Sequence, residues 1–448
     1  MMLMTAGVAT LDSGDTAWLL VSAALVLLMA PGLALFYGGL VRSKSVLNMM
    51  MMTFGSLAVI TVVWVLVGYS LAFGDDLGAG LLGNPLQHAG LGDLMPQSAD
   101  GDGSVPKILF ASFQGLFAVI TGALISGAIA DRARFGAWLA FAAIWTVLVY
   151  APVAHWVFDF SQGDHVGGWL ANRLGLVDFA GGTAVEVCSG ASALALALVL
   201  GRRVGFGRDP MRPHNLTLVM LGAGLLWFGW FGFNAGSALT AGHTAGVVFV
   251  TTWLAGAAGA LGWLAVERFR DGHATSLGAA SGLVAGLVAI TPSCASLTPF
   301  GSLVMGALAG VICAVAIGLK YRFGYDDSLD VVGVHMVGGI VGTVGIGLLA
   351  SSAAPTGVSG LLYGGGFDQL GKQVLATVVV LAYSFVVAGL LGLAVDKVMG
   401  FRIDEEHEIS GIDLVIHAET AYDLHAAAGT RGSGHSLLSS LTHREVEA

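Results

Sequence analysis

The chain has 448 residues, of which 56% are hydrophobic and only 11% carry a charge. Soluble domains have about a quarter of their residues charged, so this composition excludes an ordinary soluble protein and indicates one that crosses a membrane repeatedly. The net charge of −10 lies mainly in loops and the C-terminal region and gives no indication of a nucleic-acid partner. The three cysteines provide neither a disulfide framework nor a metal-binding spacing.

Apolar stretches long enough to cross a hydrocarbon core of about 30 Å recur along the whole chain. The expected fold is therefore an all-α polytopic membrane protein. The 67 glycines, about twice the ~7% share of ordinary proteins, suit helices that pack closely in lipid. The stretches predict eleven transmembrane helices, at residues 16–38, 48–73, 105–130, 135–158, 179–200, 214–236, 243–266, 273–291, 299–319, 331–352 and 371–396.

The basic residues predict how these helices are oriented. One alternating set of loops, together with the C-terminal region, holds every Lys and Arg except Lys107, Arg173 and Lys372. Because cytoplasmic loops carry the excess of basic residues, that set should be cytoplasmic. An odd number of helices then places the N-terminus outside the cell and the C-terminus in the cytoplasm.

Three regions follow from these helices. Residues 1–15 should form an extracellular N-terminal segment, and residues 16–400 a membrane domain. Residues 401–448 should form a cytoplasmic tail that is disordered after about residue 424, because small and polar residues prevail there. Ten helices plus one also permit two halves of five helices with opposite topology, a plan common in transporters.

Two titratable side chains lie deep inside predicted helices, Glu186 in the fifth and His335 in the tenth. An ionisable group inside a membrane costs several kcal/mol unless it is partnered, so it usually marks a path for substrate, ions or protons. The two residues fall in the last helix of each half, and we expect them to meet on an axis. The alternative is a hydrogen-bonded pair that only locks two helices, which we favour less because apolar residues would pack there at lower cost.

Aromatic side chains gather near the ends of several predicted helices, at residues 113–117 and 227–233. Aromatic faces attract desolvated cations, and the hydroxyl of Ser237 would accept a hydrogen bond from a small cation. On these residues alone, an aromatic belt at the membrane interface is the more common explanation. His155, at the end of the fourth helix, is more typical of a structural hydrogen bond than of a ligand. Because no metal set, nucleophile–base pair or cofactor motif appears, we expect no enzyme and no cofactor.

Together these motifs resemble the Amt/Mep/Rh ammonium transporters, specifically the bacterial Amt branch, over about residues 16–424. The resemblance implies eleven helices in an inverted five-plus-five repeat, a homotrimer in the lipid of the cell (inner) membrane, and one narrow apolar pore per subunit. It also implies a tail that contacts nitrogen-regulatory PII proteins. The matching segments are residues 32–44, 113–117, 178–183, 229–237, 330–339 and 411–422.

The resemblance implies an outer site that recruits ammonium. Ser237 matches a member of that site, and Asp178 matches the structural carboxylate near it. Phe158 stands where the family usually has a tryptophan. Because phenyl is a weaker cation–π partner than indole, we expect lower affinity at this site unless Trp156, which is near in sequence, compensates.

The resemblance further implies a gate and a pore beneath the outer site. Phe117 and Phe233 match the stacked phenyl gate. His335 matches the second member of the family's buried histidine pair, and Glu186 replaces the first member, as in some fungal relatives. Three further residues resemble positions that line the pore: Leu33, Phe36 and Val331.

These roles lead to a hypothesis for transport. Ammonium is captured at the outer site and loses a proton, ammonia crosses the apolar pore, and the proton is relayed through Glu186 and His335. Bare charge is costly in an apolar pore, so potassium, which has no proton to lose, is excluded. Two alternatives remain open: an ammonium sensor that signals through its tail, and an uncoupled gas channel of the Rh type.

Overall fold

The computed structural model describes residues 11–96 and 104–422, and in these ranges its regular structure is helical apart from three isolated β-bridges. Of the expected extracellular segment, residues 1–10 lie outside the described residues. The expected disorder after residue 424 also lies outside them. The description therefore covers the membrane domain except residues 97–103, and the tail as far as residue 422.

Ten helical segments of the described ranges are long and apolar enough to cross a membrane. The first five are α1 (Ser13–Leu40); α2 (Val46–Val63) with η1 (Trp64–Gly68) and α3 (Tyr69–Phe73); α4 (Lys107–Ile125) with η3 (Ser126–Ile129); α5 (Phe135–Trp145) with η4 (Thr146–Tyr150) and α6 (Ala151–Phe158); and η6 (Gly182–Val187) with α7 (Cys188–Leu200). The others are α8 (Leu216–Gly236), α9 (His243–Arg270), α11 (Pro299–Ala316) with α12 (Leu319–Phe323), η7 (Val332–Met336) with α13 (Val337–Leu349), and α14 (Asp368–Met399).

The helix expected at residues 273–291 is shorter than the rest. It is α10 (Ser276–Ile290), with 15 residues, and it begins where the hydroxyl of Thr275 accepts a hydrogen bond from the Gly278 amide at 2.9 Å. At 1.5 Å per residue it spans about 22 Å, less than the ~30 Å of a hydrocarbon core. It packs against α9 and α11.

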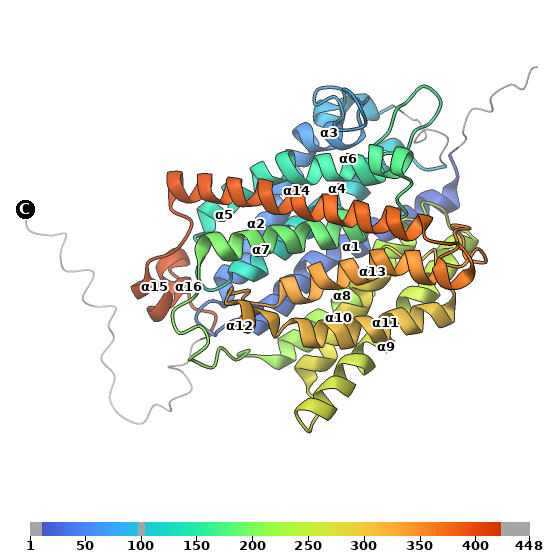
Figure 1. The fold of residues 1–448 in the computed structure, drawn as a ribbon. Helices are drawn as coiled ribbons and strands as arrows, with labels where there is room; N and C mark the ends of the chain where they lie inside the picture. Colours follow the sequence, from blue (N-terminus) through green and yellow to red (C-terminus); the bar gives the residue numbers. More distant parts are fainter. Residues whose placement is uncertain (1–10, 97–103, 423–448) are drawn as a thin grey trace, which may run out of the picture.

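The long helices run roughly side by side in one bundle, and α15 (Glu405–Ser410) and α16 (Ile412–His417) lie at one end of it (Figure 1). Helix α1 packs against α8, and α9 against α10 and α11. Glycine permits these contacts: a Cβ atom at Gly222 would lie 2.4 Å from the backbone nitrogen of Phe36, and one at Gly286 would lie 2.2 Å from the carbonyl oxygen of Ala255. The glycine-rich composition thus serves close helix packing.

Glu186 and His335 occupy equivalent places in two segments of the chain. Each lies in a π-helical turn, η6 or η7, that leads into an α-helix. Each follows by eight residues an aspartate that caps this turn. Asp178 accepts hydrogen bonds from the amides of Gly181, Gly182 and Thr183 and from the Thr183 hydroxyl, and Asp327 accepts from the amides of Val331 and Val332.

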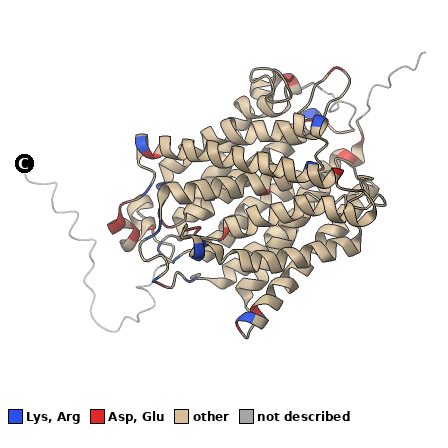
Figure 2. Cartoon of the chain, viewed as in Figure 1, with Lys and Arg blue, Asp and Glu red and all other residues tan. Residues whose placement is uncertain are grey.

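Lys and Arg residues gather at the end of the bundle where α12, α15 and α16 lie (Figure 2). The tail is held there by specific contacts. Asp413 accepts hydrogen bonds from the amides of Leu47 and Asn48 at the start of α2, at 3.0 and 2.8 Å. Glu408 pairs with Arg402 at 3.0 Å. The tail helices therefore pack against the same end of the bundle as the basic loops.

Candidate functional site

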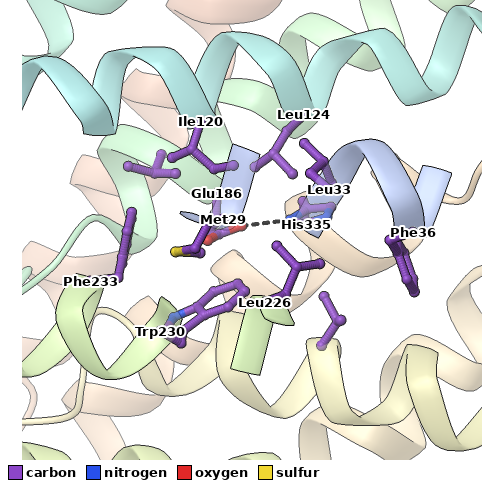
Figure 3. Close-up of a pocket in the computed structure, with 12 residues that line it drawn as sticks. Met29, Leu33, Phe36, Ile120, Leu124, Glu186, Leu226, Trp230, Phe233 and His335 are labelled. Atoms are coloured by element: carbon purple, nitrogen blue, oxygen red, sulfur yellow. Dashed lines mark hydrogen bonds and ion pairs between the residues drawn. The ribbon is translucent and has the colours of Figure 1, made fainter. Parts of the chain in front are cut away.

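A narrow cavity lies inside the bundle, between α1, α4, α8 and α10 and the two π-helical turns (Figure 3). Apart from Glu186 and His335, its walls are hydrocarbon, indole and thioether. We call it the central cavity. Its lining residues are Met29, Leu33, Phe36, Ile120, Leu124, Val185, Glu186, Leu226, Trp230, Phe233, Val284 and His335.

Glu186 and His335 are in direct contact in this cavity. Nδ1 of His335 lies 2.7 Å from Oε2 of Glu186, and the two residues are 4% and 1% exposed. A contact this short requires a proton between the atoms, either on the imidazole nitrogen or on the carboxyl oxygen. The pair can therefore hold and pass a proton in a place where the remaining lining groups offer no strong proton acceptor.

Two stacked phenyl rings close one end of the central cavity. The ring centroids of Phe117 and Phe233 are 4.0 Å apart, their planes differ by 14°, and each residue is 1% exposed. Phe158 meets Phe117 edge to face, with centroids 6.3 Å apart. Phe233 lines the central cavity, whereas Phe117 lines a second cavity on the other side of the stack. The stacked pair thus separates the two spaces.

We call the second space the Ser237 chamber. The Oγ of Ser237 donates a hydrogen bond to the carbonyl oxygen of Phe233 at 2.8 Å. Because its proton is used in this way, the hydroxyl has lone pairs available to accept a hydrogen bond from a ligand. The lining of the chamber includes Asp75, His88, Lys107, Gln114, Phe117, Phe158, Asp159, His165, Phe179 and Ser237.

A third space, which we call the Lys320 chamber, lies at the opposite end of the central cavity. The two share Phe36, Val284 and His335 as lining residues. The amine of Lys320 lies 2.6 Å from Asp330 and donates to the carbonyl oxygen of Asp327 at 3.0 Å. The three spaces therefore form one path, interrupted by the phenyl stack and narrowed by the walls of the central cavity.

Residues 17–422 match the model of the Ammonium Transporter Family. The chain belongs to this family. Among its relatives, the "Ammonium transporter" of Mycobacterium tuberculosis is 57% identical over 441 residues, which cover 94% of this chain and 92% of that protein. Solved structures agree with the fold. A protein described as "Sensor Amt Protein" gives a TM-score of 0.83 at 28% identity, covering 90% of this chain and 98% of its own. Mep2 of Candida albicans gives 0.81 at 34% identity, with 89% and 88% covered.

In this ammonium transporter family member, two of the expected site residues and the alternative residue Trp156 lie away from the path. Trp156, named above as an alternative source of the missing indole, donates from its indole nitrogen to the carbonyl oxygen of Leu81 at 2.8 Å and does not line the Ser237 chamber, which leaves the expectation of lower affinity in place. The oxygens of Asp178 are used in capping η6, and this residue does not line the Ser237 chamber. Val331 is fully buried and lines none of the three spaces.

Several lining residues were missed by the sequence reasoning. Met29 precedes Leu33 and Phe36 on α1 at helical spacing, so periodicity was a usable signal for it. Trp230 lies within the aromatic run at residues 227–233, and its indole donates to the Thr291 hydroxyl at 2.8 Å. Gln114 lies between two noted phenylalanines and gave no chemical signal of its own.

His155 has a structural environment. Its Nδ1 lies 2.9 Å from the carbonyl oxygen of Ala72 and 3.3 Å from Asp159, and its Nε2 lies 3.5 Å from Asp76. The residue is fully buried and does not line the Ser237 chamber. It joins the end of α6 to the end of α3 and to the loop that follows, as expected of a structural hydrogen bond.

Proposed function

We propose that the chain transports ammonium by carrying ammonia and a proton separately along this path. Ammonium binds in the Ser237 chamber, where Ser237 accepts one of its hydrogen bonds and Phe158 and Phe117 face its charge. It gives up a proton, and ammonia passes the phenyl stack into the central cavity. The proton moves through Glu186 and His335 and rejoins ammonia on the far side, so that one positive charge crosses per cycle.

Selectivity follows from the apolar walls. Potassium and ammonium are cations of similar size, and a rigid cavity separates them poorly. A bare cation loses its hydration in a hydrocarbon-lined cavity at a large cost in free energy, whereas ammonia loses far less. Only the cation that can leave its proton behind avoids this cost. Potassium therefore does not pass from the Ser237 chamber into the central cavity.

The single observation that carries the proposal is the contact between Glu186 and His335 inside an otherwise apolar cavity. A pore for ammonia alone needs no titratable group, and a pore for a hydrated ion needs more than two polar groups. One acid–imidazole pair at 2.7 Å, next to a closed phenyl stack, is what separate movement of a proton and a neutral molecule requires.

The proposal includes the arrangement in the membrane. We place the membrane domain at residues 16–400 in the cell (inner) membrane and the tail, residues 401–448, in the cytoplasm. We assign α10 (Ser276–Ile290) as an eleventh crossing, because only an odd number of crossings puts nearly all the basic loops on one side. The N-terminus is then outside. The equivalent capping of η6 and η7 supports two halves of opposite topology.

The partners of the chain are part of the proposal too. We expect a homotrimer with one path per subunit, as the resemblance implies. We also expect PII-type regulatory proteins to bind at the end that carries the basic loops and the tail. The packing of Asp413 against the start of α2 places the tail close to the Lys320 chamber end of the bundle and supports this location.

A sensor is the second candidate function. The similar solved structure described as a sensor favours it, and so does the attachment of the tail to the membrane domain. In a sensor, ammonium binding changes the tail without net flux.

Currents evoked by ammonium on solid-supported membranes test the proposal. Proteoliposomes of the full chain should give a transient that saturates with ammonium and is absent with potassium. Ammonia flux without current, measured by a pH dye inside the vesicles, would instead show an uncoupled gas channel. Binding without flux would show a sensor.

A further inference from the structure

An acid–imidazole cluster on the wall of the Ser237 chamber is left without a role by the proposed function. Asp159 directly follows Phe158 at the end of α6 and is 5% exposed. Nε2 of His165 lies 2.9 and 3.0 Å from the two carboxylate oxygens of Asp159, and Nδ1 of His165 lies 3.5 Å from Asp75. All three residues line the chamber.

The loop that carries His165 holds this histidine in a fixed place. Gln162 and His165 exchange two backbone hydrogen bonds, at 3.2 and 2.9 Å, around a turn in which Gly163 has a φ of +55°. The carbonyl oxygen of Asp159 accepts hydrogen bonds from the amide of Gly168 and the side chain of Asn172. The pairing of His165 with Asp159 is therefore a built feature of the loop.

A second observation in the same chamber points to a ligand. Gln114 on α4 lines the chamber, is only 9% exposed, and its Oε1 is buried without a hydrogen-bond partner among the described residues. A buried acceptor of this kind costs free energy unless a donor reaches it. Ammonium carries N–H donors that suit this oxygen and a positive charge that the carboxylate attracts.

We propose that Asp159, held by His165, is a cation-attracting group of the Ser237 chamber, where its charge replaces the attraction that an indole at position 158 would supply. The inference rests on the proposed function and adds a specificity residue to its first step. Asp159 draws ammonium toward Gln114 and Ser237. His165 is a positioning residue that sets the net charge of the wall.

The charge of His165 determines the strength of the attraction. Partial burial disfavours the charged imidazole, but the carboxylates of Asp159 and Asp75 outweigh burial and raise the pKa of His165 above its ordinary value. As pH falls through this pKa, the imidazolium cancels a carboxylate charge, and the wall attracts ammonium less. Among the described residues, other titratable or charged groups lie near this cluster: Asp76 and His155 behind Asp159, Asp164 beside His165 in sequence, and Tyr69, His88 and Lys107 in the lining of the chamber.

Ammonium-evoked currents at a series of pH values test the inference. The pKa of His165 lies above ~6.5, the ordinary value for imidazole. In the wild type, the half-saturating ammonium concentration should therefore rise several-fold as pH falls through that higher pKa. His165→Gln should remove this rise and keep the low value throughout. Asp159→Asn should raise the half-saturating concentration about fivefold at neutral pH, the scale of one partly screened charge, and leave the maximal current within about twofold.

His243→Gln is the matched control, because His243 is an exposed imidazole at the start of α9 that does not line the chamber; its curves should follow the wild type. A wild-type pH dependence in His165→Gln overturns the inference, and so does an unchanged half-saturating concentration in Asp159→Asn. Absence of any current in the wild type is a different failure. It refutes the proposed function, and this inference falls with it.

Discussion

The imidazole of His335 and the carboxylate of Glu186 meet at 2.7 Å across two helices that begin in the same way. Each residue lies in a π-helical turn, eight residues after the aspartate that caps that turn. The capping aspartates determine where η6 and η7 begin, and this places Glu186 and His335 on facing walls of the central cavity. A carboxylate and an imidazole differ from two imidazoles in their charge: adding one proton makes the acid–imidazole pair neutral overall, whereas adding one proton to two neutral imidazoles makes that pair positive.

This difference predicts the effect of Glu186→His. An extra proton on a pair of imidazoles places positive charge in the apolar cavity, whereas the same proton on a carboxylate removes charge. The maximal current of the variant should therefore be at least threefold lower than that of the wild type, which corresponds to a barrier higher by on the order of 1 kcal/mol. Its current should also fall at a higher pH on acidification. Maximal ammonium-evoked current from pH 5 to pH 8 is the measurement. An unchanged rate and pH profile in a variant with a normal size-exclusion profile would contradict the role of the pair.

Ser237→Leu tests the recruitment step. The hydroxyl donates to the carbonyl oxygen of Phe233 and has lone pairs left to accept from ammonium, and leucine offers none. Loss of a hydrogen bond to a charged donor costs about 1.5–3 kcal/mol, so the half-saturating concentration should rise by about tenfold or more. The maximal current should change much less, because Ser237 lies on the outer side of the phenyl stack. An unaltered half-saturating concentration would count against the role of Ser237.

Phe158→Trp tests the missing indole. The side chain of Phe158 borders an open chamber and meets Phe117 edge to face, so a larger ring has room on the chamber side. Indole is the stronger cation–π partner, and the gain of about 0.5–1 kcal/mol should lower the half-saturating concentration two- to fivefold. Phe367→Trp is a suitable control, since Phe367 is 73% exposed and lies outside the chamber. Equal shifts in both variants would refute the explanation.

Much of this site could be expected from the sequence, for a physical reason. Charge inside an apolar helix is so costly that Glu186 and His335 stood out without any structure. The phenyl pair and Ser237 needed the family resemblance, because aromatic residues near helix ends are common for other reasons. The π-helical turns that place the pair were not expected, since hydrophobic periodicity does not separate a π-turn from an α-helix over five or six residues.

Other features depended on contacts that no pattern reveals. Trp156 is two residues from Phe158, about 200° around the helix, and this rotation sends it to Leu81 instead of the chamber. Asp159 and His165 lie in a loop whose turn brings them together, and a short polar loop has no periodicity to read. The capping role of Asp327 was missed because Asp330, three residues later, opened the apolar stretch. In the structure Asp330 pairs with Lys320.

Asp327 gives a prediction about stability. It is buried in the loop before η7, and burial together with the nearby carboxylate of Asp330 raises the pKa of Asp327 from 3.8 to about 6, although Lys320 and two amides oppose this. A carboxyl group whose pKa is higher in the folded than in the unfolded state contributes stability at low pH. This contribution is lost as pH rises through about 4 to 6.

The test compares the thermal unfolding midpoints of the wild type and Asp327→Asn in detergent from pH 5 to pH 8. The wild type should lose stability relative to the variant as pH rises toward 7, by at most roughly 3 kcal/mol, the free-energy equivalent of the raised pKa. Asparagine does not titrate, so the thermal midpoint of the variant should depend less on pH. The asparagine side chain keeps only one acceptor oxygen for the amides of Val331 and Val332, so the variant should be less stable than the wild type at pH 5. Glu419→Gln, an exposed carboxyl in the tail, should keep the wild-type slope. Equal slopes for Asp327→Asn and the wild type would show that the capping carboxylate is ionised throughout, with Lys320 and the amides of Val331 and Val332 offsetting both its burial and the charge of Asp330.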